Sequence, residues 1–132
     1  MTAELFWLTL TAMMTSMFWL PYMIDRVNVR GVMGAFGNPG PDALMQSSWA
    51  ERNMAAHRNA NENLILFAIA VLALHLTSTG TGLTALAAMV TFFARAAHFV
   101  LQLLGIPVLR SVAFMIGWIC FLLMALTALG VL

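Results

Sequence analysis

The sequence predicts an all-α integral membrane protein whose fold is a bundle of four transmembrane helices. The chain has 132 residues, of which 62% are hydrophobic and only 8% are charged, whereas a soluble domain carries about 25% charged residues. Its apolar residues fall into four segments, and the first, third and fourth are near the ~20 residues that a bilayer core requires. One polar connection separates the first two segments. We therefore expect a single domain over residues 1–132, with helices at about 4–30, 47–77, 82–104 and 107–131.

The first predicted helix has an apolar span from Leu5 to about Ile24. Trp19 and Tyr22 stand near its end, as expected for aromatic residues at a membrane interface, and Pro21 predicts a kink in its last turn. A cleavable signal peptide is the alternative interpretation. However, the start has no basic region, and the apolar stretch is longer than a signal peptide allows. We therefore expect a retained helix, followed by a loop rich in glycine and proline.

The second predicted helix has a polar first half and an apolar second half. The apolar half, Leu64 to Leu76, is too short to span a bilayer by itself. We therefore expect one long helix whose polar half faces protein rather than lipid. At 100° per residue, its polar side chains fall within an arc of about 140°. They form a polar stripe that comprises Glu51, Arg52, Arg58, Asn59, Glu62 and Asn63.

The third predicted helix carries polar residues on one face, because Arg95, His98 and Gln102 are spaced i, i+3 and i+7. Glycine and proline in the segment 105–107 predict the turn to the fourth helix. That helix has Arg110 near its start and is otherwise apolar. Ionisable groups within the membrane are therefore few, and we take them as the candidates for function.

Arg95 is the clearest of these candidates. A charged side chain in the middle of a membrane costs about 2.5–3.5 kcal/mol on insertion scales, so we expect Arg95 to face the bundle interior or a wet cavity. One interpretation is a structural ion pair with Glu62 or Glu51 that fixes the register of the helices. The other is a site for an anionic ligand, because guanidinium groups clamp carboxylates through paired hydrogen bonds. Such a site would comprise Arg30, Arg52, Arg95 and Arg110.

The arginine residues also predict the orientation in the membrane. Four of them lie between residues 25 and 63, and Arg110 lies beside the third connection. The positive-inside rule therefore places the first and third loops in the cytoplasm and both termini outside. Because the sequence shows no targeting features, we expect a bacterial inner membrane. With a net charge of +1 and no lysine, the chain has no basic surface for nucleic acid.

Two other classes of function fit the sequence poorly. No two of His57, His75 and His98 stand at i, i+4, so we expect no metal or haem site. Small multidrug exporters also have four helices in a short chain. These exporters share a glutamate that lies within the membrane in their first helix. The first apolar span of this chain contains no acidic residue.

The polar motifs as a set resemble those of the MAPEG family, the membrane-associated proteins of eicosanoid and glutathione metabolism. The resemblance covers the whole chain in order, with a matching number of helices. The matching blocks are Glu51-Arg52 with Ala56-His57-Arg58-Asn59 and Glu62-Asn63, then Arg95-Ala96-Ala97-His98, then Gly105-Ile106-Pro107 with Arg110-Ser111, and Arg30 with Ala35-Phe36-Gly37-Asn38-Pro39.

This resemblance implies a homotrimer that uses glutathione as co-substrate. Glutathione would bind between protomers near the cytoplasmic side, and the implied function is a transferase or peroxidase acting on small lipophilic electrophiles taken up among the membrane lipids. Arg110 and Ser111 match positions that stabilise the glutathione thiolate in catalytic members. The binding candidates, transferred by motif position, are Arg30, Arg52, Asn59, Glu62, Arg95 and Arg110.

The chain also departs from the family pattern at three positions of the implied glutathione site. Ala55 stands where glutathione-using members often have an arginine, and Gln102 and Phe114 stand where they have tyrosines. Each difference removes a charge or a hydrogen-bond donor. The alternative function is therefore a non-catalytic member of the family, which binds a lipid or another anionic molecule or serves as a structural subunit.

Overall fold

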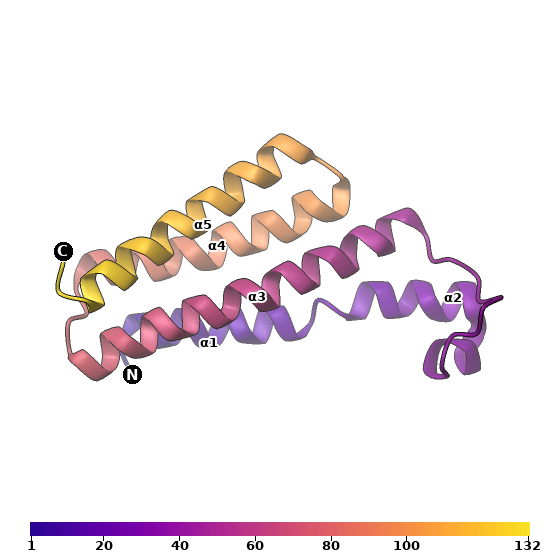
Figure 1. Cartoon of the computed structure of the whole chain (residues 1–132), viewed down its shortest axis with the longest axis horizontal. Helices are drawn as coiled ribbons and strands as arrows, with labels where there is room; N and C mark the ends of the chain where they lie inside the picture. Colours follow the sequence, from indigo (N-terminus) through magenta and orange to yellow (C-terminus); the bar gives the residue numbers. More distant parts are fainter.

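The computed structural model describes residues 1–132 and contains five helices (Figure 1). Four segments are long and apolar enough to cross a membrane, and the first of them consists of two helices in succession. The prediction of an all-helical membrane protein with four spanning segments is therefore confirmed. The helices are α1 (Ala3–Ser16), α2 (Leu20–Phe36), α3 (Ser48–Thr77), α4 (Gly82–Leu104) and α5 (Pro107–Ala128).

The helices differ in length, and the difference shapes the molecule. At 1.5 Å per residue, α4 and α5 are about 33–35 Å long and match the ~30 Å of bilayer hydrocarbon, whereas α3 is about 45 Å long. Figure 1 shows α2 and the first turns of α3 extending together beyond the turn between α4 and α5, while both termini lie at the opposite end. We call these the loop end, which carries residues 37–47, and the terminal end.

The apolar core lies between α3, α4 and α5 in the half of the bundle near the terminal end. Its largest buried side chains are Phe67, Leu74 and Met124, which pack against Ala87 and Ala88 of α4. Small residues let helix backbones approach closely, and this approach is the main source of helix association inside a membrane. α4 and α5 consequently form the tightest pair of the bundle.

The first membrane segment is broken just before Pro21. The last hydrogen bonds of α1 end at Met17, and α2 begins at Leu20, because a proline has no N–H and its ring clashes with the preceding turn. The break frees the carbonyl of Phe18, which accepts a hydrogen bond of 3.0 Å from Nδ2 of Asn53 on α3. Asn53 is completely buried, so this side chain supplies the donor that the helix lost.

The terminal end also has a buried polar contact between distant parts of the chain. The side chain of Glu4 in the first turn of α1 is only 6% exposed, and it accepts a 2.6 Å hydrogen bond from the hydroxyl of Thr84 in α4. Thr84 and Thr81 also cap the start of α4 reciprocally. A carboxylate is favourable beside the N-terminus of a helix. Glu4 therefore links the start of α1 to the start of α4.

Asn53 should therefore contribute to stability in a way that a surface asparagine of the same helix does not. Asn53→Leu should lower the free energy of unfolding by about 1–3 kcal/mol, because the buried Phe18 carbonyl loses its only side-chain donor. The measurement is unfolding in mixed detergent micelles, with Asn61→Leu as the matched control at an exposed position. Equal losses for the two variants would contradict a role for Asn53 at the break.

Candidate functional site

Arg95 lies inside the bundle, between α4 and α5. Its side chain is 5% exposed, and its Nη2 donates a 3.0 Å hydrogen bond to the backbone carbonyl of Phe114. The guanidinium also lies over the ring of Phe114, with 5.1 Å between Cζ and the ring centroid, a distance typical of a cation–π contact. The expectation that Arg95 faces the bundle interior therefore agrees with its burial.

The glycine at position 117 makes room for this arginine. A Cβ atom at Gly117 would stand 2.5 Å from Nη2 and 2.9 Å from Nε of Arg95, which is closer than side-chain atoms approach. Gly117 itself is buried on α5, one turn after Phe114. The position of the guanidinium thus depends on a missing side chain on the neighbouring helix.

The predicted ion pair of Arg95 is absent. No carboxylate lies within 4.0 Å of its guanidinium, and both Glu51 and Glu62 are exposed on α3. The interpretation that one of them neutralises Arg95 inside the chain is wrong, because α3 turns these carboxylates outward. A backbone carbonyl and an aromatic ring take the place of the counter-ion.

One donor of Arg95 remains unused. Its Nη1 atom is buried and has no hydrogen-bond partner, and the side chain borders a small cavity of about 20 Å³ between α1, α3, α4 and α5. This volume suffices for a single water molecule. Thr11, Thr91 and Asn63 also line the cavity, so it is polar enough to hold one.

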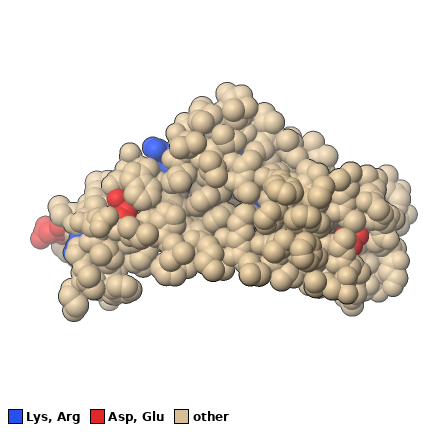
Figure 2. Space-filling model, turned by 180° about the vertical axis from the view of Figure 1, so that it is seen from behind, with Lys and Arg blue, Asp and Glu red and all other residues tan.

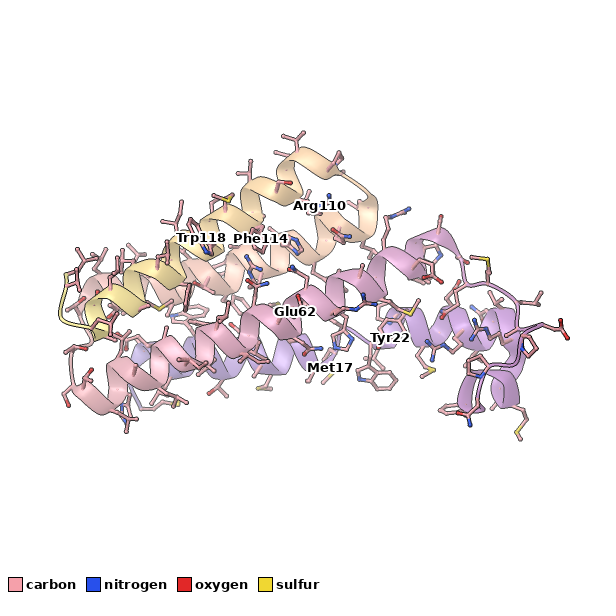
Figure 3. The ribbon with its side chains drawn as sticks, in the orientation of Figure 1. Met17, Tyr22, Glu62, Arg110, Phe114 and Trp118 are labelled. Atoms are coloured by element: carbon pink, nitrogen blue, oxygen red, sulfur yellow. The ribbon has the colours of Figure 1, made fainter.

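Further polar groups lie on the loop-end side of Arg95. His98, one turn along α4, is 7% exposed, and its ring centroid lies 6.1 Å from that of Phe114. The charges of Arg95 and Arg110 both act on this ring. Figure 3 shows Arg110 and Phe114 along α5, with Glu62 on α3, which packs against α5.

The polar stripe of α3 faces away from the interior at three of its four charged positions. Glu51, Arg58 and Glu62 are exposed, and Asn59 is half-buried, where its carbonyl accepts a 2.8 Å hydrogen bond from Asn63. None of these three charged groups forms an ion pair within the chain. Arg58 was not among the predicted binding residues, although its place in the polar stripe was a signal for it.

Charged side chains are few on the face of the molecule drawn in Figure 2. Most of the surface visible in that view is uncharged, and its charged side chains gather mainly toward the loop end. A membrane-spanning helix that shows charge on its outer face requires another polar surface against it, because lipid hydrocarbon solvates charges poorly. The stripe therefore defines a candidate site that a single chain leaves open on one side.

Two of the predicted binding arginines have partners elsewhere in the chain. Nε of Arg52 donates a 3.0 Å hydrogen bond to the carbonyl of Leu103 in the last turn of α4. Nε of Arg30 donates a 2.7 Å hydrogen bond to the carbonyl of Leu44 in the loop. The structure thus places Arg95 and Arg110 around one aromatic and imidazole cluster, whereas Arg30 lies on α2 and bonds to the loop.

Ser111 lies on the outer face of α5. Its hydroxyl donates a 3.0 Å hydrogen bond to the carbonyl of Pro107, and the side chain is exposed. It borders a shallow groove whose other side chains are apolar, among them Val112, Met115 and Ile119. A lipophilic molecule could occupy this groove from the membrane with the hydroxyl at one end.

Comparison with known proteins gives one match. The MAPEG family model matches residues 5–130 of the chain. No curated protein and no solved structure matches it.

The contact between Gly117 and Arg95 predicts strong coupling between these positions. Gly117→Ala should destabilise the protein, because the new Cβ displaces the guanidinium from the Phe114 carbonyl. In an Arg95→Leu background the same change should cost less, with a coupling free energy of about 0.5–3 kcal/mol. Thermal unfolding of the four variants in detergent completes the cycle. Additive losses would show that Gly117 does not serve to seat Arg95.

Proposed function

The chain belongs to the MAPEG family, and from this premise we propose that it is a glutathione-dependent membrane transferase or peroxidase that acts on lipophilic electrophiles. The observation that carries the proposal is the exposed charge on the polar stripe of α3. Arg58 and Glu62 are exposed on a helix that is long and apolar enough to cross the membrane, and they have no ion-pair partner in the chain.

We propose that a second copy of the chain closes the open side of this site. A lone chain would expose Glu51, Arg58 and Glu62 to lipid or headgroups, at a cost of a few kcal/mol for each group within the hydrocarbon. A homotrimer, the assembly that the family resemblance implies, would cover all three copies of the stripe by one symmetric contact. Glutathione then binds between protomers.

Glutathione fits such a site by its charges. At neutral pH the tripeptide carries two carboxylates, one ammonium group and a thiol. Arg58 and Arg110 supply forked donors for carboxylates, Glu62 supplies a partner for the ammonium group, and Asn59 supplies an amide. Arg30, Arg52 and Arg95 remain candidates from the family pattern, and each of them also holds a backbone carbonyl in its own chain.

Activation of the thiol follows from the same residues. A thiol with a pKa near 8.5 becomes a better nucleophile at neutral pH when a nearby cation or hydroxyl favours its thiolate. We assign this role to Arg110 and Ser111, which are adjacent in the first turn of α5. The apolar groove beside Ser111 would admit the electrophile directly from the lipid.

A non-catalytic family member is the second candidate. Ala55, Gln102 and Phe114 offer neither the charge nor the hydroxyl groups that the family pattern has there, and the ring of Phe114 is already engaged by Arg95. Such a protein would bind a lipid or another anionic molecule in the same cleft, or act as a structural subunit. For either candidate we propose the bacterial inner membrane, with the loop end in the cytoplasm.

Binding of reduced glutathione separates the two candidates. Calorimetry on the detergent-purified protein should give saturable binding, weakened about 10- to 100-fold in Arg110→Ala or Glu62→Gln, because each change removes a hydrogen bond to a charged group. Arg26→Gln is the matched control, since Arg26 bonds to Gln46 in the loop. A well-folded oligomer without any binding would favour the non-catalytic candidate.

Turnover tests the assignment of Ser111. With a soluble electrophile, Ser111→Ala should lower kcat by about 10- to 100-fold while the Kd for glutathione changes little, because the hydroxyl acts on the thiolate rather than on the carboxylates. Ser16→Ala provides the control, since Ser16 is also exposed and also bonds to a carbonyl of its own helix. An unchanged kcat would remove Ser111 from the mechanism.

A further inference from the structure

The end of α2 turns out of the line of its helix. Gly31 has a φ of +71° within the helix, a left-handed conformation that side chains other than glycine rarely adopt. Figure 1 shows the chain after this point leaving the α2 axis and forming a short helical turn across it, beyond the ends of α4 and α5. We call residues 31–36 the crossing turn.

The crossing turn and the loop behind it expose large apolar side chains. Val32, Met33 and Phe36 are 60%, 86% and 73% exposed. In the loop, Leu44 and Met45 are 63% and 83% exposed. Isolated apolar residues on a surface are ordinary, but a set of this size within one short element marks an interaction surface.

Hydrogen bonds hold this surface in place. The carboxylate of Asp25 on α2 accepts hydrogen bonds from the backbone N–H and the hydroxyl of Ser47. Gln46 donates to the Tyr22 carbonyl at 2.8 Å and accepts from Nε of Arg26 at 3.1 Å. Because these bonds fix the loop against α2, Met45 cannot become buried by a simple collapse of the loop.

The position of the crossing turn matches the edge of a bilayer. The 28 residues from Ala3 to Arg30 rise about 40 Å at 1.5 Å per residue. The hydrocarbon is about 30 Å thick, and the bilayer with its headgroups is about 40–45 Å thick. The apolar outer side of α2, which includes Leu20 and Ile24, leads from the hydrocarbon toward the crossing turn.

We propose that the crossing turn, together with Leu44 and Met45, is an interfacial membrane anchor. It lies in the headgroup layer at the loop end, roughly parallel to the membrane plane, with Met33 and Phe36 reaching toward the acyl chains. Short amphipathic segments bind at this depth through such side chains. Ala35, which is 5% exposed, faces the protein instead, and Arg26 and Arg30 place positive charge at the level of the lipid phosphates.

Site-directed spin labelling tests the anchor in the intact protein. In a Cys120→Ala background, nitroxide labels are attached at Met33→Cys, at Phe36→Cys and, as the control in the adjoining loop, at Asp42→Cys. The labelled proteins are reconstituted into vesicles of phosphatidylethanolamine and phosphatidylglycerol. Power saturation then compares collision with oxygen, which concentrates in lipid, and with a water-soluble nickel chelate.

The anchor predicts a several-fold higher ratio of oxygen to nickel collisions at residues 33 and 36 than at residue 42. High nickel collision at all three positions would overturn the proposal, because the surface would then face water. Low collision with both reagents at residues 33 and 36, with an immobilised spectrum, would also overturn it and assign the surface to contact with a second copy of the chain. This inference does not depend on glutathione binding.

Discussion

Hydrocarbon offers no hydrogen-bond partner, so every polar group that this chain places inside the bundle must find its partner in protein or in a trapped water molecule. The chain meets this constraint mainly with side-chain donors that bind backbone carbonyls. Asn53 binds the Phe18 carbonyl at the break, Arg95 binds that of Phe114, and Arg52 binds that of Leu103. The two arginine bonds each join two different helices, and the Asn53 bond joins α3 to the break between α1 and α2, so each bond sets how these segments lie against each other.

This use of donors divides the arginines into two groups. Arg26, Arg30, Arg52 and Arg95 each hold an acceptor in another part of the chain. Arg58 and Arg110 hold none, and they therefore remain free to meet a ligand or a second chain. The division is physical, because a guanidinium that already serves a backbone carbonyl can offer a ligand only its remaining N–H groups. It explains why Arg58, which is exposed, and Arg110, which is half-buried, carry our proposal.

The sequence alone predicted the four spanning segments, the burial of Arg95 and the family. It did so because apolar length, the high cost of a buried charge and a motif spread over four helices are visible without coordinates. It did not predict the partner of Arg95, since helical spacing shows which face a residue occupies but not which backbone carbonyl stands opposite. Asn53 was missed for the same reason, because its acceptor exists only where Pro21 interrupts the helix.

The cavity beside Arg95 bears on how this residue takes part in function. A space of about 20 Å³ admits a water molecule and no tripeptide, so within one chain a ligand can reach the unused Nη1 donor only through water. Arg95 binds the Phe114 carbonyl directly. Phe114 lies four residues after Arg110 on α5. Arg95 is thus placed to hold the part of α5 that presents Arg110 and Ser111. On this view a change at Arg95 alters ligand binding by moving α5, and the half-buried Arg110 gives the cleaner test of the site.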